Sequence, residues 1–137
     1  MMLAMSWFYG TYNWAVALVG LACVLGHAYP IWGGFKGGKI VATSFGVLVG
    51  FNFWLALIGV IFLLILLYFF SMVSLAAMMS YTLVTVIIIL NSPYIYGLCF
   101  TLITLLMIYR HKENIDRIVQ GQERRVNFGL KKRDKQK

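Results

Sequence analysis

Two groups of polar residues have the types and spacing needed for phosphate chemistry, and the first is a glycine-rich loop. Gly37, Gly38 and Lys39, with Lys36 just before them, lead directly into an apolar segment that begins at Ile40. Glycines let backbone N–H groups approach an anion without interference from Cβ atoms, and a neighbouring Lys adds positive charge. The loop therefore predicts phosphate binding by these four residues. The alternative is a flexible turn whose lysines reach the membrane surface.

The loop matches a nucleotide-binding P-loop only in part. Residues 33–39 fit the first seven positions of that pattern, but the eighth position, which needs Ser or Thr as a magnesium ligand, is Ile40. Cys23 and Cys99 lack both a CxxC pairing and His residues at ligand spacing. We therefore expect no nucleotide, no metal and no other cofactor.

The second polar group follows the last apolar run of the chain. If a helix continues past residue 110, His111 and Asn114 lie three residues apart on one face, where they can orient a polar headgroup. Glu123, held near His111, Arg117 or Lys39, would tie the tail to the core. The alternative is a basic juxtamembrane stretch that attracts anionic lipid.

The segments that must position these groups are membrane helices. Hydrophobic residues make up 61% of the 137 residues and charged residues only 12%, and residues 1–35 and 40–109 carry no formal charge. A membrane span needs about 20 apolar residues, and a buried charge is costly there. This composition excludes a soluble enzyme, and the net charge of +8 belongs to a tail without any nucleic-acid-binding module, so no nucleic acid partner is expected.

The chain is expected to be all-α, a polytopic membrane helix bundle of about four to five transmembrane or half-membrane helices. Pro30 should end the first helix, Gly50 and Asn52 should divide a long apolar run, and Asn91, Ser92 and Pro93 should form a short turn. His27, near Pro30, is expected to be a hydrogen-bonded interfacial residue rather than a catalyst. The predicted helical segments are 11–29, 40–50, 52–70, 72–90 and 94–109.

The chain is interpreted as a single membrane domain, 1–137, with a helical core over about 11–110 and a basic tail over 111–137. Ten of the twelve basic residues lie between 110 and 137. Because Lys and Arg favour the cytoplasmic side, the tail is expected to be cytoplasmic and the protein a multi-pass protein of the plasma membrane.

Several short motifs together resemble one family. They are Gly26-His27-Ala28-Tyr29-Pro30, Phe35-Lys36-Gly37-Gly38-Lys39 with Val41-Ala42-Thr43, Val73-Ser74-Leu75, and His111-Lys112-Glu113-Asn114-Ile115-Asp116-Arg117 with Gly121 and Glu123. Their types, order and separation by apolar helices are similar to those of the acyl-phosphate:glycerol-3-phosphate acyltransferases (PlsY type) of bacterial membranes. The resemblance covers about residues 15–125.

The resemblance implies transfer of a fatty acyl group from acyl phosphate to glycerol 3-phosphate, which forms lysophosphatidic acid in phospholipid synthesis. The implied partners are these two substrates and membrane lipid. Gly37, Gly38 and Lys39 would form the phosphate loop, His111 and Asn114 would bind or orient the phosphorylated substrates, and Ser74 would add a phosphate contact. The implied catalytic residues are Lys39, His111 and Asn114, with structural support from His27, Arg117 and Glu123.

The expected mechanism is direct attack of the glycerol 3-phosphate hydroxyl on the acyl carbonyl. Phosphate is already a good leaving group, so no nucleophilic triad is required, and Lys39 and the loop amides would stabilise the developing charge. The proton would go either to His111 or to the departing phosphate.

The chain departs from the family pattern at four places. Ile40 stands where the family has a further glycine, Lys112 replaces the usual Arg, and Ala77 stands where a second Ser often follows. A first family motif of the Ser-Gly-Asn-x-Gly-Ala-Thr-Asn kind is absent from residues 1–30. The chain is therefore expected to correspond to the C-terminal two thirds of the family, as a truncated reading frame, a pseudogene product or one part of a split enzyme that needs an N-terminal half as partner.

Two other functions compete with this interpretation. One is a catalytically inactive fragment or membrane subunit. The other is a small multi-pass transporter, which would generally need an ionisable residue within the membrane, and residues 40–109 contain no charged residue.

Overall fold

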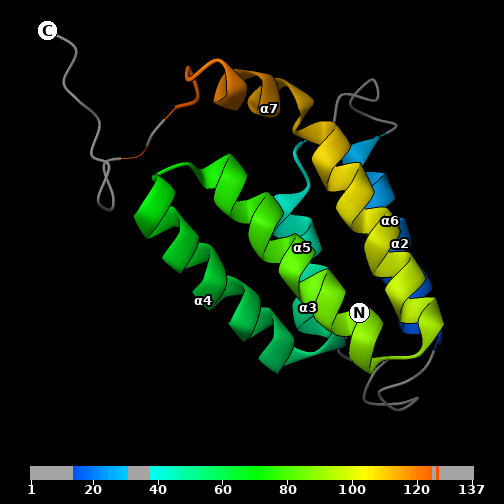
Figure 1. Cartoon of the computed structure of the whole chain (residues 1–137). Coiled ribbons are helices and arrows are strands. Elements are labelled where there is room, and N and C mark those ends of the chain that lie inside the picture. The colour runs from blue at the N-terminus through cyan, green and yellow to red at the C-terminus, as the bar shows by residue number, and fades with distance from the viewer. Residues whose placement is uncertain (1–13, 31–37, 125, 127–137) are drawn as a thin grey trace, which may run out of the picture.

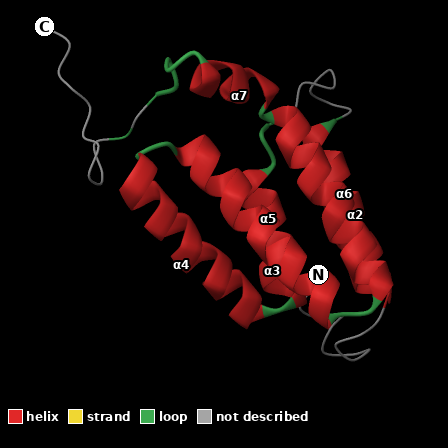
Figure 2. Ribbon diagram, viewed as in Figure 1, coloured by secondary structure: helices red, strands yellow, loops and turns green. Residues whose placement is uncertain are grey.

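The computed structural model describes residues 14–30, 38–124 and 126. Within these ranges every regular element is a helix (Figures 1 and 2). The helices are α2 (Trp14–Ala28), α3 (Val41–Phe51), α4 (Phe53–Phe70), α5 (Val73–Asn91), α6 (Tyr94–Arg110) and α7 (Lys112–Val119). The predicted all-α class is therefore confirmed.

The helix ends follow local signals in the sequence. The Oδ1 atom of Asn52 accepts hydrogen bonds from the N–H groups of Trp54 at 2.9 Å and Leu55 at 3.2 Å, so it caps α4 at the break after α3. α2 ends at Ala28, two residues before Pro30, and α6 begins directly after Pro93. The predicted division of the long apolar run is correct.

Neighbouring helices pack in the order α2–α3, α3–α4, α4–α5, α5–α6 and α6–α2. Between them lies a core of large buried side chains that includes Leu48, Tyr81, Ile88, Phe100 and Ile103. Within the apolar part, the hydroxyls of Thr85 in α5 and Thr104 in α6 are 2.8 Å apart. This bond satisfies two buried polar groups where water is excluded.

α4 and α5 are each long and apolar enough to cross a membrane, and the bent pair α6 and α7 meets the same test together. α2 and α3 are shorter apolar helices. α4 exposes side chains such as Trp54, Ile61, Leu64 and Phe69, as expected where lipid surrounds a helix. The bundle therefore combines full-length and shorter membrane helices.

Helical structure continues past the last apolar run, but with a sharp bend. α6 ends at Arg110, and α7 begins at Lys112 after a bend of 58°. α7 lies across one end of the bundle (Figure 1). The sequence from residue 110 onward is rich in charge and unsuited to hydrocarbon, so the turn keeps it at the surface. His111 lies at the bend itself, between the two helices.

Candidate phosphate-binding site

A cavity of about 630 Å³ lies where the end of the glycine loop, the start of α5, α7 and the segment after α7 meet. It is lined by Lys39, Val41, Val73, Ser74, Ala77, His111, Asn114, Arg117, Gln122, Glu123, Arg124 and Val126. The structure thus brings Lys39, from the first polar group, to the same cavity as the second polar group. Lys36 and Gly37 lie outside the described residues.

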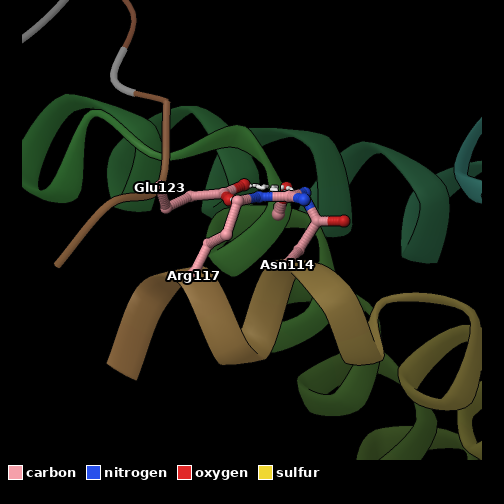
Figure 3. Close-up of polar contacts among 4 residues, drawn as sticks. Asn114, Arg117 and Glu123 are labelled. Atoms are coloured by element: carbon pink, nitrogen blue, oxygen red, sulfur yellow. Dashed lines mark hydrogen bonds and ion pairs between the residues drawn. The ribbon is translucent and has the colours of Figure 1, made fainter. Parts of the chain in front are cut away.

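Glu123 is the centre of a hydrogen-bonded network in one wall of this cavity (Figure 3). Its Oε1 atom accepts from Ser74 Oγ at 2.8 Å and from Asn114 Nδ2 at 2.7 Å, and its Oε2 atom accepts from Arg117 Nε at 2.9 Å. Burial raises the pKa of the Glu123 carboxyl, but these three hydrogen bonds and the Arg117 charge outweigh burial and hold the pKa below its usual value. Glu123 is therefore a charged structural support.

The chain reaches Glu123 through a tight reversal at the end of α7. Gly121 has a φ of +70°, a left-handed conformation that glycine adopts without strain. The N–H of Gly121 donates to the Ile118 carbonyl at 3.1 Å and that of Gln122 to the Arg117 carbonyl at 2.7 Å, as in a Schellman motif. Beyond Glu123, the N–H of Val126 donates to the Ser71 carbonyl at 2.9 Å. These bonds fix the wall at both ends.

Asn114 is oriented by the same network. Its Nδ2 atom donates to Glu123 and also, at 2.7 Å, to Ser74 Oγ, and the side chain is almost fully buried. With the amide nitrogen held there, Oδ1 points away from Glu123 (Figure 3), and it has no hydrogen-bond partner among the described residues. A buried carbonyl oxygen of this kind can accept a hydrogen bond from a hydroxyl group.

His111 is held in one tautomer by the backbone. Its Nδ1 atom lies 2.8 Å from the Met107 carbonyl oxygen, and because a carbonyl only accepts, Nδ1 carries the hydrogen and Nε2 the lone pair in the neutral ring. Burial lowers the pKa of His111, and the charge of Lys39 lowers it further. The hydrogen bond to Met107 and the charge of Glu123 oppose this only in part. A neutral imidazole with a free Nε2 can accept a proton near neutral pH.

The loop side of the cavity is built differently. Lys39 is exposed, while Gly38 lies against His27: a Cβ atom added at Gly38 would be 3.2 Å from His27 Nε2. The Gly38 carbonyl accepts a hydrogen bond from Arg110 Nε at 3.3 Å. His27 is thus placed beside the loop and is absent from the residues that line the cavity.

Ile40 has an unusual backbone conformation. Its φ of 56° is left-handed, which is strained for a β-branched residue, and its side chain is only 2% exposed. Ile40, which the resemblance marks as a departure from glycine, therefore lies at a position where glycine would be relaxed. Burial of the Ile40 side chain offsets this strain.

Sequence reasoning missed three residues at or near the cavity. Gln122 and Arg124 flank Glu123 and line the cavity, and Arg110 contacts the loop from the end of α6. The available signal for Gln122 and Arg124 was their position directly beside Glu123 in the sequence. Arg110 had no local signal, because its contacts to Gly38 and Tyr29 are long-range. The described residues contain no group of three or more His, Cys, Asp and Glu that could hold a metal.

A sequence profile described as glycerol-3-phosphate acyltransferase matches residues 1–121. The chain belongs to this family. Among curated relatives, the glycerol-3-phosphate acyltransferase of Lactiplantibacillus plantarum is 46% identical over 114 residues, which cover 82% of this chain and 55% of the relative. The enzyme of the same name from Albidiferax ferrireducens is 42% identical and covers 94% of this chain and 59% of the relative.

Two solved structures of a glycerol 3-phosphate acyltransferase share the fold of this chain. Both are crystal structures of PlsY (YgiH), an integral membrane glycerol 3-phosphate acyltransferase, in its glycerol 3-phosphate form and its lysophosphatidic acid form. The glycerol 3-phosphate form matches with a TM-score of 0.86 and 35% sequence identity. The match covers 91% of this chain and 63% of the PlsY chain. The second has a TM-score of 0.84 at the same identity. The chain spans only about half the length of the curated relatives and under two thirds of these structures.

Proposed function

We propose that the cavity binds phosphorylated substrates and that the chain transfers an acyl group from acyl phosphate to glycerol 3-phosphate. One observation carries this proposal: Lys39 lines the same cavity as His111 and Asn114, which lie more than 70 residues away in sequence. The membership in the family and the match to PlsY in its glycerol 3-phosphate form support it. The cavity can hold two small polar groups, since its volume is typical of small-molecule sites.

The binding roles follow from the chemistry of each residue. Lys39 would neutralise phosphate charge, together with Lys36 and the N–H groups of Gly37 and Gly38. Asn114 Oδ1 would accept a hydrogen bond from a glycerol hydroxyl and so orient it. Ser74 donates its proton to Glu123, so in this arrangement Ser74 would hold the carboxylate instead of binding phosphate directly.

The reaction itself needs no covalent enzyme intermediate. The hydroxyl oxygen of glycerol 3-phosphate would form a new C–O bond to the acyl carbonyl carbon, and the bond between that carbon and the phosphate oxygen would break. The hydroxyl proton would go to Nε2 of His111 or to the departing phosphate. Lys39 and the loop amides would stabilise the negative charge that develops on the carbonyl oxygen and the leaving group.

The location of the site suggests where the substrates enter. The cavity lies at the end of the bundle where α7 and the basic tail begin, and we propose that this end faces the cytoplasm, as the concentration of basic residues indicates. A water-soluble phosphate would then enter from the cytoplasm, while the acyl chain and the product would remain in the bilayer. Reporter labels fused at the C-terminus would test this orientation.

A membrane subunit that needs a further polypeptide is the second candidate function. The observation that favours it is that this chain covers only about half the length of the curated relatives. Such a subunit would bind phosphate but turn over substrate only with a partner that supplies the remaining part of the family fold. Binding and turnover therefore have to be measured separately.

The deciding experiment uses membranes that contain only the 137-residue chain, prepared from a host strain without its own enzyme of this kind. Labelled glycerol 3-phosphate is supplied with acyl phosphate, and with acyl-CoA in parallel. Lysophosphatidate formed from acyl phosphate and lost in Lys39→Ala would support the proposal. Absence of product from a chain shown to be inserted would contradict enzyme activity of this chain alone, and retained glycerol 3-phosphate binding would then favour the subunit.

A further inference from the structure

Arg110, the last residue of α6, contacts two segments that are distant in sequence. Its Nε atom donates to the Gly38 carbonyl at 3.3 Å, and its guanidinium carbon lies 5.8 Å from the centre of the Tyr29 ring. Tyr29 directly follows α2, a helix that packs against α6. One side chain therefore joins the ends of two adjacent helices to the end of the glycine loop.

The two residues joined by this hydrogen bond each directly precede a residue that lines the cavity. Lys39 follows Gly38, and His111 follows Arg110. We propose that Arg110 is the positioning residue that holds the end of the glycine loop against α6 and so fixes Lys39 relative to His111. This inference rests on the proposed function of the cavity, to which it adds a residue that does not itself line the site.

The geometry of a peptide explains why this contact matters for anion binding. The Gly38 carbonyl and the Lys39 N–H belong to one trans peptide, in which they point in opposite directions. While the carbonyl is held by Arg110, the Lys39 N–H faces away from that contact and is available as a donor. A flip of this peptide would place an oxygen acceptor where an anion needs a donor. His27, beside the Cα of Gly38, further limits the conformations open to the loop.

Lys112 provides a matched control for the charge of Arg110. It lies two residues away, and its Nζ atom is 5.3 Å from the centre of the Tyr109 ring. Arg110→Met and Lys112→Met each remove one cation that lies over a tyrosine, but only the first removes the hydrogen bond to the Gly38 carbonyl. Arg110→Lys keeps the charge and tests whether a single ammonium donor can replace the planar guanidinium.

The kinetic test measures KM for glycerol 3-phosphate and kcat in each variant and asks which of the two changes. A displaced Lys39 weakens phosphate binding, so Arg110→Met should raise this KM about five- to tenfold, while Arg110→Lys should recover part of the loss and Lys112→Met should match wild type. A purely structural role would lower the amount of active protein, and hence the apparent kcat, without changing KM. An unchanged KM in Arg110→Met would overturn the proposal.

A second measurement does not depend on activity. Endoproteinase Lys-C cuts after lysine, so the rate of cleavage after Lys39 in detergent micelles reports how firmly the end of the loop is held. This rate should rise about fivefold or more in Arg110→Met and stay at the wild-type value in Lys112→Met. Equal rates in all three proteins would overturn the positioning role. If wild type neither binds nor acylates glycerol 3-phosphate, the proposed function fails, while the cleavage rates still decide whether Arg110 holds the loop.

Discussion

The two walls of the cavity are held in place in different ways. In the wall made by α5, α7 and residues 120–124 and 126, three side chains bond to the carboxylate of Glu123, a residue that is only 8% exposed. On the loop side, exposed Lys39 follows Gly38, whose carbonyl has one exposed hydrogen bond at 3.3 Å. A buried carboxylate held by three hydrogen bonds fixes geometry, whereas an exposed cation can stay hydrated until an anion arrives. The comparison indicates one wall that is suited to orienting a bound group and one that is suited to supplying charge.

The largest expected effect comes from removing the charge of the loop wall. Lys39→Ala should lower acyl transfer by about 10²–10³-fold, the usual cost of losing one group that stabilises developing negative charge. The free energy of unfolding should change little, because Lys39 is exposed. Labelled lysophosphatidate and thermal unfolding in detergent measure the two quantities. Similar losses of activity and stability would contradict the division of roles between the walls.

Breaking the other wall should have the opposite pattern, with a loss of stability as the main effect. Glu123→Ala removes the acceptor of Ser74 Oγ and Arg117 Nε and one of the two acceptors of the buried Asn114 amide, at an expected cost of about 2–3 kcal/mol in the free energy of unfolding. Glu123→Gln keeps an acceptor for Asn114 and should cost less. Denaturant unfolding of the two variants in the same detergent measures the difference. If Glu123→Ala unfolded like wild type, the network would not be the support that its geometry indicates.

A smaller effect is expected at Ile40, where the loop side meets α3. Ile40→Ala and Ile40→Gly both lose the buried side chain, but only glycine relaxes at a φ of 56°. The glycine variant should therefore be the more stable of the two by about 1 kcal/mol, although alanine is the better helix former. Comparing the two variants by thermal unfolding cancels the loss of packing that they share. A more stable alanine variant would show that the left-handed conformation at this residue is not retained.

The smallest expected effect is on the pH dependence of stability. It should separate the contribution of His111 from that of Glu123. The pKa of His111 is lowered on folding, so the unfolded chain binds the proton more tightly, and stability should fall as pH drops through the ordinary histidine value of about 6.5. The pKa of Glu123 is also lowered, so its contribution is present at neutral pH and is lost only below the ordinary carboxyl value of about 4.3.

Variants at each residue test these two ranges of pH. His111→Gln should remove the loss of stability near pH 6 and leave the loss below pH 4.3, while Glu123→Gln should do the reverse. If His111 accepts the substrate proton, the acid limb of the pH–rate profile should lie below 6.5, since the neutral ring is favoured in the folded state. A limb above 6.5 would contradict a neutral His111 as base.

Much of the fold could be predicted because its signals are local. The break at Asn52 depends on one side chain that caps the next helix, and the helix ends near Pro30 and Pro93 depend on the missing N–H and fixed φ of proline. The absence of charge over residues 40–109 was enough to predict membrane helices. Each of these properties involves residues only a few positions apart.

The candidate site could be predicted only in part from such local signals. Sequence reasoning left Glu123 free to pair with His111, Arg117 or Lys39, and the structure selects Arg117 because the turn at Gly121 reverses the chain. It also left open whether a helix continues past residue 110, and the structure has α7 there, after a 58° bend that brings it across the bundle. The remaining predicted site roles stay predictions until the variants are measured.

The sequence by itself determined which residues have the chemistry to bind a phosphate and which segments are apolar enough for a membrane, because residue type and local spacing control both. Only the tertiary structure decided that Lys39 and His111 share a cavity, that Ser74 bonds to Glu123 across 49 positions, and that Arg110 reaches the loop. These contacts depend on how the helices pack and where the chain turns. Packing is a property of the whole bundle, so no short stretch of sequence contains it.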